Sequence, residues 1–319
     1  MIQHYVPVLT HYLAIGAPPC HCDPAYFFRS FSLPMSILRR STASLLLAIV
    51  TPATIAVVPD VALAQSSAAL SSGAITYADI AGLADSAPLI VHARLRKLSR
   101  VEDARAKPAA AGTARFYVVA DTRALITGGS PIGQSFAYLV DLPVDAKGKP
   151  RARKKDEVIL FARAVAGRPG ELQLVRPNAQ IAWSETSEVR VRAVVTELLS
   201  PQAPARVTGV RELTYVPGTL AGEGETQIFL TTADSSAASL TVRHQPGQPP
   251  QWGASFSELV AELGNPPRAE TVEWYRLACF LPPSAPTNTN MSDGDEAKRI
   301  AEADYRMVIA ALGPCRRTM

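Results

Sequence analysis

The segment that most constrains this chain is residues 35–65, MSILRRSTASLLLAIVTPATIAVVPDVALAQ, because it has the composition of an export signal. Arg39-Arg40 supplies a positive start, and a mostly apolar run follows over residues 45–58. Ala62-Leu63-Ala64 then offers the small residues after which a signal peptidase cleaves. We therefore expect translation to start at Met35 and the chain after the signal to fold outside the cytoplasm.

A membrane anchor is the alternative for residues 35–64, and it would need about 20 consecutive apolar residues. Pro52, Pro59 and Asp60 interrupt such a span, so removal of residues 35–64 as a signal peptide is the better interpretation. Residues 1–34 have no evident role ahead of an export signal, and we interpret them as a leader that does not belong to the protein. Their Cys20-His21-Cys22 lacks the further ligands that a metal site requires.

Only two cysteines, Cys279 and Cys315, follow the predicted signal. An even pair in an oxidising compartment predicts a disulfide, with two unrelated thiols as the alternative. The chain after Ala64 has 255 residues, enough for one large or two small domains, and we favour two. Its 29 basic and 26 acidic residues leave a net charge of +3, which is too small an excess to indicate a nucleic-acid-binding protein.

The first unit is predicted over residues 75–200. Thr76 and Asp79 form a capping box for a short helix, and five segments of strand composition follow between residue 89 and residue 175. Five strands joined by tight turns indicate a small OB-like antiparallel β-barrel, since closure removes exposed sheet edges. Residues 185–199 fit either a helix or a strand, and Ser184 as a cap favours a helix trailing the barrel.

Pro201 and Pro204 indicate a linker to a second β-rich unit over residues 205–319. Three strands are expected between residues 206 and 244, followed by helices that begin near Ser255, in residues 269–281 and at Ser292. In the last helix, one face carries apolar residues, and the Cys279–Cys315 bridge would hold this C-terminal element against the second unit. These apolar residues are Ala301, Tyr305, Val308 and Leu312. The fold class predicted for the whole chain is α+β.

Two basic segments are candidates for an anion-binding patch. The segments comprise Arg94, Arg96, Lys97, Lys147, Lys149, Arg151, Arg153, Lys154 and Lys155. Together they would attract an anionic polymer such as a glycan or lipid head groups. Aromatic residues are not interleaved with them, so nucleic acid is not expected. The simpler interpretation of residues 147–155 is a solvated hairpin loop.

Catalytic patterns are scarce in the chain after the signal. Glu223 and Glu225 could act as the paired acids of a glycoside hydrolase, but their spacing between glycines is more typical of a turn or bulge. His92 and His244 have no partner at metal-ligand spacing, and no serine lies in a G-x-S-x-G motif. We expect no metal, no cofactor and no catalytic residue. Four large aromatic residues, Trp183, Trp252, Trp274 and Tyr275, are more typical of packing than of a ligand groove.

The strings GEGETQIFL, WYRLACFLPP and LGPC resemble those of an uncharacterised family of exported alphaproteobacterial proteins, and the resemblance runs from about Ile75 to the C-terminus. This resemblance implies no activity, cofactor or site residue. More loosely, a barrel with a trailing helix is similar to the OB-like modules of netrin-like protease inhibitors, whose N-terminal cysteine framework is absent here.

Together these features predict an exported, non-catalytic binding or envelope-associated protein, located in the periplasm or secreted. Its expected partner is an anionic envelope polymer or another protein, and no membrane anchor is expected after cleavage. The first alternative is a hydrolase that acts on envelope polymers, and the second is a secreted protease inhibitor.

Overall fold

A computed structural model describes residues 75–102, 110–129, 131–257 and 263–319. The predicted leader and the predicted signal at residues 35–64 lie outside these residues. Within the described ranges, no helix is both long enough and apolar enough to span a bilayer.

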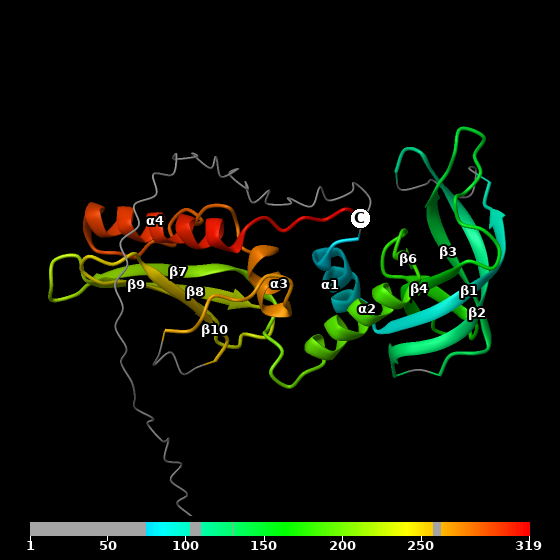
Figure 1. The fold of residues 1–319 in the computed structure, drawn as a ribbon, viewed down its shortest axis with the longest axis horizontal. Coiled ribbons are helices and arrows are strands. Elements are labelled where there is room, and N and C mark those ends of the chain that lie inside the picture. The colour runs from blue at the N-terminus through cyan, green and yellow to red at the C-terminus, as the bar shows by residue number, and fades with distance from the viewer. Residues whose placement is uncertain (1–74, 103–109, 130, 258–262) are drawn as a thin grey trace, which may run out of the picture. The chain divides into compact units, whose positions relative to one another are not determined.

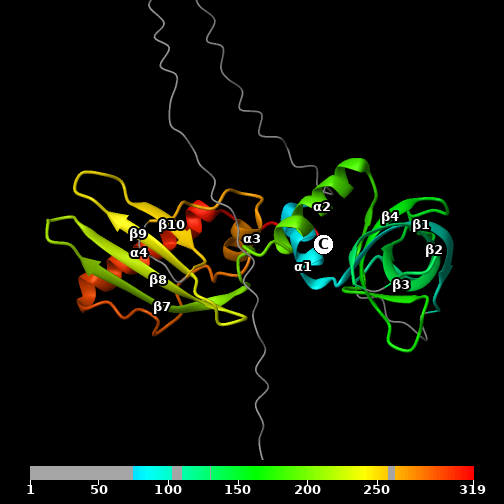
Figure 2. The ribbon, with the colours of Figure 1, turned by 90° about the horizontal axis from the view of Figure 1, so that it is seen from below.

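The N-terminal sheet closes into a five-stranded barrel, as the sequence predicts (Figures 1 and 2). Its strands are β1 (Leu89–Arg100), β2 (Thr113–Gly128), β3 (Ser135–Pro143), β4 (Glu157–Ala164) and β5 (Glu171–Leu174). They follow the order β1-β2-β3-β5-β4, and β4 pairs back to β1. The β3–β5 pairing is parallel and the others are antiparallel. An additional short strand, β6 (Gln180–Ala182), pairs with β4 and was not predicted.

Strand β1 is buried more completely than its sequence alternation indicates. In the sequence, Leu89, Val91, Ala93 and Leu95 alternate with Ile90 and His92, and such alternation predicts a strand with one buried face. Ile90 and His92 are nevertheless buried too. The outer face of β1 is covered at His92 by Trp183 and by Glu188 of the helix that follows β6. Half-burial therefore applies only to the second half of the strand.

Helices α1 (Tyr77–Ser86) and α2 (Glu185–Leu198) both begin at capping boxes. Thr76 and Asp79 cap α1 as predicted, and Ser184 caps α2 together with Ser187. The ambiguous segment is therefore a helix, and it buries Val191 and its neighbours Val194 and Val195. Helix α1 contacts α2 and β4, which places the N-terminal helix beside the barrel's trailing helix.

The second sheet is an antiparallel meander in the order β10-β9-β8-β7. Its strands are β7 (Val207–Pro217), β8 (Gly224–Thr232), β9 (Ser239–His244) and β10 (Gln251–Ser255). The first three were predicted, whereas β10 was missed. Ser255 ends β10 and was expected to cap a helix, most of which falls on residues 258–262, outside the described residues.

Helix α4 (Gly294–Leu312) lies across one face of this sheet (Figure 1). The predicted apolar face is confirmed, because Ala301, Tyr305, Val308 and Leu312 are buried. Ser292 is not its cap, which was a wrong prediction. Asp293 occupies the cap position, while the buried Ser292 hydroxyl accepts a hydrogen bond from the Tyr215 backbone N–H. The Ser292 hydroxyl therefore bonds to the backbone of β7 and does not cap α4.

A disulfide joins Cys279 to Cys315, as predicted. Cys279 is the C-cap of the short helix α3 (Val272–Ala278), and Cys315 follows the end of α4. The same two helices are also joined by Trp274, whose indole N–H donates to the Leu312 carbonyl at 2.8 Å. The bridge therefore ties the ends of two helices that already pack together.

Candidate binding surface of the barrel

The two basic segments meet on the barrel. Backbone hydrogen bonds join them: Lys155 N–H donates to the Leu95 carbonyl at 2.8 Å, and Leu95 N–H donates to the Asp156 carbonyl at 2.9 Å. The basic surface is defined here as the nine residues Arg94, Arg96, Lys97, Lys147, Lys149, Arg151, Arg153, Lys154 and Lys155. All of them are exposed except Arg94, which is half-buried. The connection between β3 and β4 thus adds its charges to those of β1.

The carboxylates of nearby acidic residues accept hydrogen bonds from backbone N–H groups of this loop. The Asp145 carboxylate accepts from the N–H groups of Lys147 and Lys149, both at 2.9 Å, and Asp156 accepts from Arg153 N–H at 2.7 Å. These bonds fix the turn that exposes the lysines. One side-chain pair within the surface is formed by Arg96 and Asp121, at 3.3 Å on exposed side chains, where such a pair contributes little energy.

A groove of about 430 Å³ borders the basic surface and is called here the Trp183 groove. It is lined by Arg151, Ala152, Asp156, Glu157, Val158, Gln180, Ala182 and Trp183. Arg151 belongs to both features, so the groove is continuous with the basic surface.

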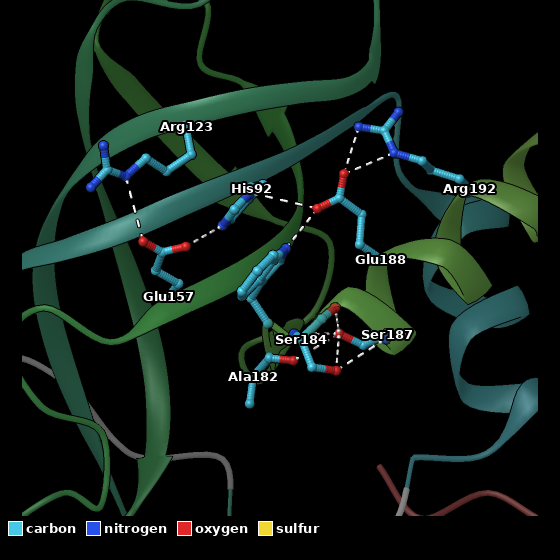
Figure 3. A network of polar contacts seen from close by, with 9 residues as sticks. His92, Arg123, Glu157, Ala182, Ser184, Ser187, Glu188 and Arg192 are labelled. Carbon is cyan, nitrogen blue, oxygen red and sulfur yellow. Dashed lines mark hydrogen bonds and ion pairs between the residues drawn. The ribbon is translucent and has the colours of Figure 1, made fainter.

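Behind the groove, His92 lies between two carboxylates (Figure 3). Its Nε2 is 2.8 Å from Glu157 Oε2, and its Nδ1 is 3.6 Å from Glu188 Oε2. The imidazole stacks on the Trp183 indole with 4.7 Å between ring centres and 2° between planes. Arg123 pairs with Glu157, and Arg192 pairs with Glu188. Strands β1 and β4 and helix α2 each contribute to this cluster, so it fastens the trailing helix to the barrel.

The N-terminus of α2 places Glu188 in this cluster. The Ser184–Ser187 capping box begins the helix, and Glu188 in its first turn is favoured by the helix dipole. The Trp183 indole N–H and the Arg192 guanidinium both donate to its carboxylate, at 2.6 Å and 2.8 Å. These two hydrogen bonds, in that order, lower the pKa of Glu188 below its ordinary value of 4.5.

Glu188 should therefore stabilise the fold in a pH-dependent way. A lowered pKa in the folded state means that the stabilisation is present above about pH 4.5 and is lost as the pH falls further. We expect Glu188→Gln to reduce the free energy of unfolding by about 1 kcal/mol at pH 7, because two charge-assisted hydrogen bonds are weakened. Urea unfolding at pH 7, 5 and 3 should show this difference shrinking toward pH 3. A difference that stays constant over this range would contradict the assignment.

A second groove, of about 590 Å³, lies on β2, β3 and β5, the face that OB-folds use for ligands. The directly paired Tyr117 and Leu139 line it, with 43% and 49% of their surfaces exposed. Arg115 forms a two-pronged pair with Asp141 at 2.7 and 3.0 Å, and Arg168 pairs with Glu171. Because two of its three arginines are already paired, this groove attracts anions less strongly than the basic surface does.

The other candidate residues are held in separate places. Glu223 closes the β7–β8 turn, where its carboxylate accepts from the N–H groups of Thr219 and Leu220. This agrees with the prediction that Glu223 lies in a turn. Glu225 pairs with Arg243 on β9. His244 Nε2 lies 2.8 Å from the buried Asp304 of α4. Neither glutamate lines either of the grooves described above. Among the described residues, no group of histidine, cysteine and acidic side chains could hold a metal ion.

Sequence spacing missed the His92 cluster, because its members are distant in the chain and meet only through the β1–β4 register. Trp183 also differs from expectation: it lines a groove, whereas Trp274 and Tyr275 are buried as packing residues.

No model of a known protein family and no curated protein sequence matches this chain. The class that the fold and surface define is therefore an OB-like β-barrel protein with a second, disulfide-tied β-rich unit. The resemblance to an exported alphaproteobacterial family stays a prediction.

Proposed function

We propose that this protein is an exported, non-catalytic binding module whose barrel binds an anionic envelope polymer at the basic surface. The observation that carries the proposal is the meeting of the two basic segments through the hydrogen bonds of Leu95 with Lys155 and Asp156. Nine positive side chains from one barrel edge then act on the same ligand.

Export is supported by the signal-like segment at residues 35–64 and by the disulfide, since disulfides persist in oxidising compartments. A binding role is supported by the fact that the candidate acidic and imidazole groups are engaged in bonds within the fold. His92, His244, Glu223 and Glu225 each bond to a neighbouring group of the fold, and the structure does not gather them around one groove.

The proposal predicts binding to a polyuronate such as alginate, with an affinity that falls as salt rises, because the Debye length shrinks to about 8 Å at 0.15 M. The triple variant Lys147→Gln/Lys149→Gln/Lys154→Gln should bind at least tenfold more weakly at 50 mM salt, since each lysine near an anionic surface contributes up to about 1 kcal/mol. Isothermal titration calorimetry measures both effects.

The matched control is Lys298→Gln/Arg299→Gln/Arg306→Gln on α4, which removes the same charge from another element. It should change the affinity by less than threefold. Equal losses in the two triple variants, or no binding by the unaltered protein at 50 mM salt, would overturn the proposed function. Vesicles of phosphatidylglycerol, tested in parallel, distinguish a lipid surface from a glycan as the source of the negative charge.

A further inference from the structure

Trp183 is held in place by two contacts although it is partly exposed to solvent. Its indole N–H donates to Glu188 Oε2 at 2.6 Å, and one face of the ring is covered by His92 at 4.7 Å. The residue still exposes 36% of its surface and lines the Trp183 groove. With its N–H edge and one face occupied, the exposed part is the opposite face and the outer ring edge. An ordered aromatic face of this kind is ready to stack on a ligand without losing side-chain entropy.

Polar groups of three kinds surround this aromatic face. Arg151 supplies a cation. Asp156 and Glu157 supply carboxylates that already bond to Arg153 N–H and to His92 and Arg123, but a carboxylate has about four lone-pair sites and can accept a further hydrogen bond. Gln180 also lines the groove; its side-chain oxygen accepts from the Tyr138 hydroxyl at 2.6 Å, and its NH₂ group can only donate. The groove therefore offers one apolar platform, one cation, acceptors and an amide donor.

We infer that the Trp183 groove binds one sugar ring of an acidic polysaccharide, an inference that rests on the proposed function and names its ligand class. The C–H face of a pyranose ring is apolar and weakly positive, which complements the negative face of an indole. Hydroxyl groups of the sugar donate to Asp156 and Glu157, and its carboxylate pairs with Arg151.

The test compares alginate with inorganic polyphosphate, which carries charge but no sugar ring. Trp183→Ala should weaken alginate binding about tenfold and leave polyphosphate binding within twofold, because only alginate uses the stacking surface. Trp183→Phe retains a ring and should stay within about threefold of the unaltered protein for both polymers. Thermal unfolding of each variant checks that the barrel is intact, and Trp252→Phe on β10 is the matched control.

Several results overturn the inference while the proposed function stands. One is unchanged alginate affinity in Trp183→Ala while the triple lysine variant still loses binding. Another is an equal loss for both polymers, because the residue would then act only by shaping the basic surface. A third, with single-stranded DNA included as a further polymer in the same titrations, is a loss of DNA binding in Trp183→Ala without a loss of alginate binding, which would assign the platform to nucleobases. Absence of binding to every polymer by the unaltered protein overturns the proposed function itself.

Discussion

Removing the Cys279–Cys315 disulfide is expected to lower the free energy of unfolding by about 3 to 4 kcal/mol. The bond closes a loop whose ends are 36 residues apart in sequence, and cross-links of that span restrict the unfolded chain by this amount. The loop contains all of α4, which covers the second sheet. Urea unfolding of the oxidised protein and of Cys279→Ala/Cys315→Ala measures the difference.

Removing the disulfide should also destabilise the contact between the C-terminal residues and helix α1. Thr318 and Met319, just beyond Cys315, donate their backbone N–H groups to Asp79 of α1 at 3.0 to 3.2 Å. Hydrogen exchange at these two amides should therefore accelerate in the alanine variant. An unfolding midpoint that is the same with and without the disulfide would contradict the predicted contribution of the bond.

Arg276→Met is expected to destabilise the protein by about 3 kcal/mol at pH 7, because it leaves a buried carboxylate with too few partners. Arg276 of α3 forms two hydrogen bonds to Asp85 of α1, at 2.8 and 2.9 Å, and both side chains are almost fully buried. Arg206 also contacts Asp85, but its side chain is 47% exposed. Thermal and urea unfolding measure the loss.

The pH dependence of this pair has a definite sign. Burial alone would raise the pKa of Asp85, but the hydrogen bonds and charges of Arg276 and Arg206 outweigh burial and lower it below its ordinary value of 3.8. The stabilisation is therefore complete above about pH 4 and disappears as the pH falls below it.

A matched control is Arg299→Met on α4, which removes an exposed arginine paired with Glu296 three residues earlier. It should cost less than about 0.5 kcal/mol, since exposed pairs contribute little. Similar losses for Arg276→Met and Arg299→Met would show that burial of the Asp85 pair does not matter.

Local signals in the sequence predicted much of the fold. The capping box at Thr76 and the cap residue Ser184 located two helices, because the hydrogen bonds of such caps involve residues only three positions apart. Five strand-like segments with tight turns predicted barrel closure, since a closed sheet has no exposed edges. Short strands escaped prediction. Strand β6 has three residues, and three of the five residues of β10 are small, so neither strand carries a clear period.

Features that depend on distant contacts could not be predicted. Ser292 has the sequence context of a helix cap, but its hydroxyl accepts a hydrogen bond from Tyr215 of β7, which is distant in the chain. His92 looks like a solvated strand residue until α2 covers it. Trp183 likewise looked like packing, because its exposure depends on how β6 meets the loop before β4. The basic segments were visible, whereas their meeting required the register of β1 and β4.

Binding of an anionic polymer to the barrel can be located by hydrogen exchange measured with and without alginate. Exchange should slow in residues 94–97, 147–156 and 180–183 and stay unchanged in the second sheet. Protection confined to β7–β10 and α4, or no protection at a saturating polymer concentration and 50 mM salt, would contradict binding at the barrel.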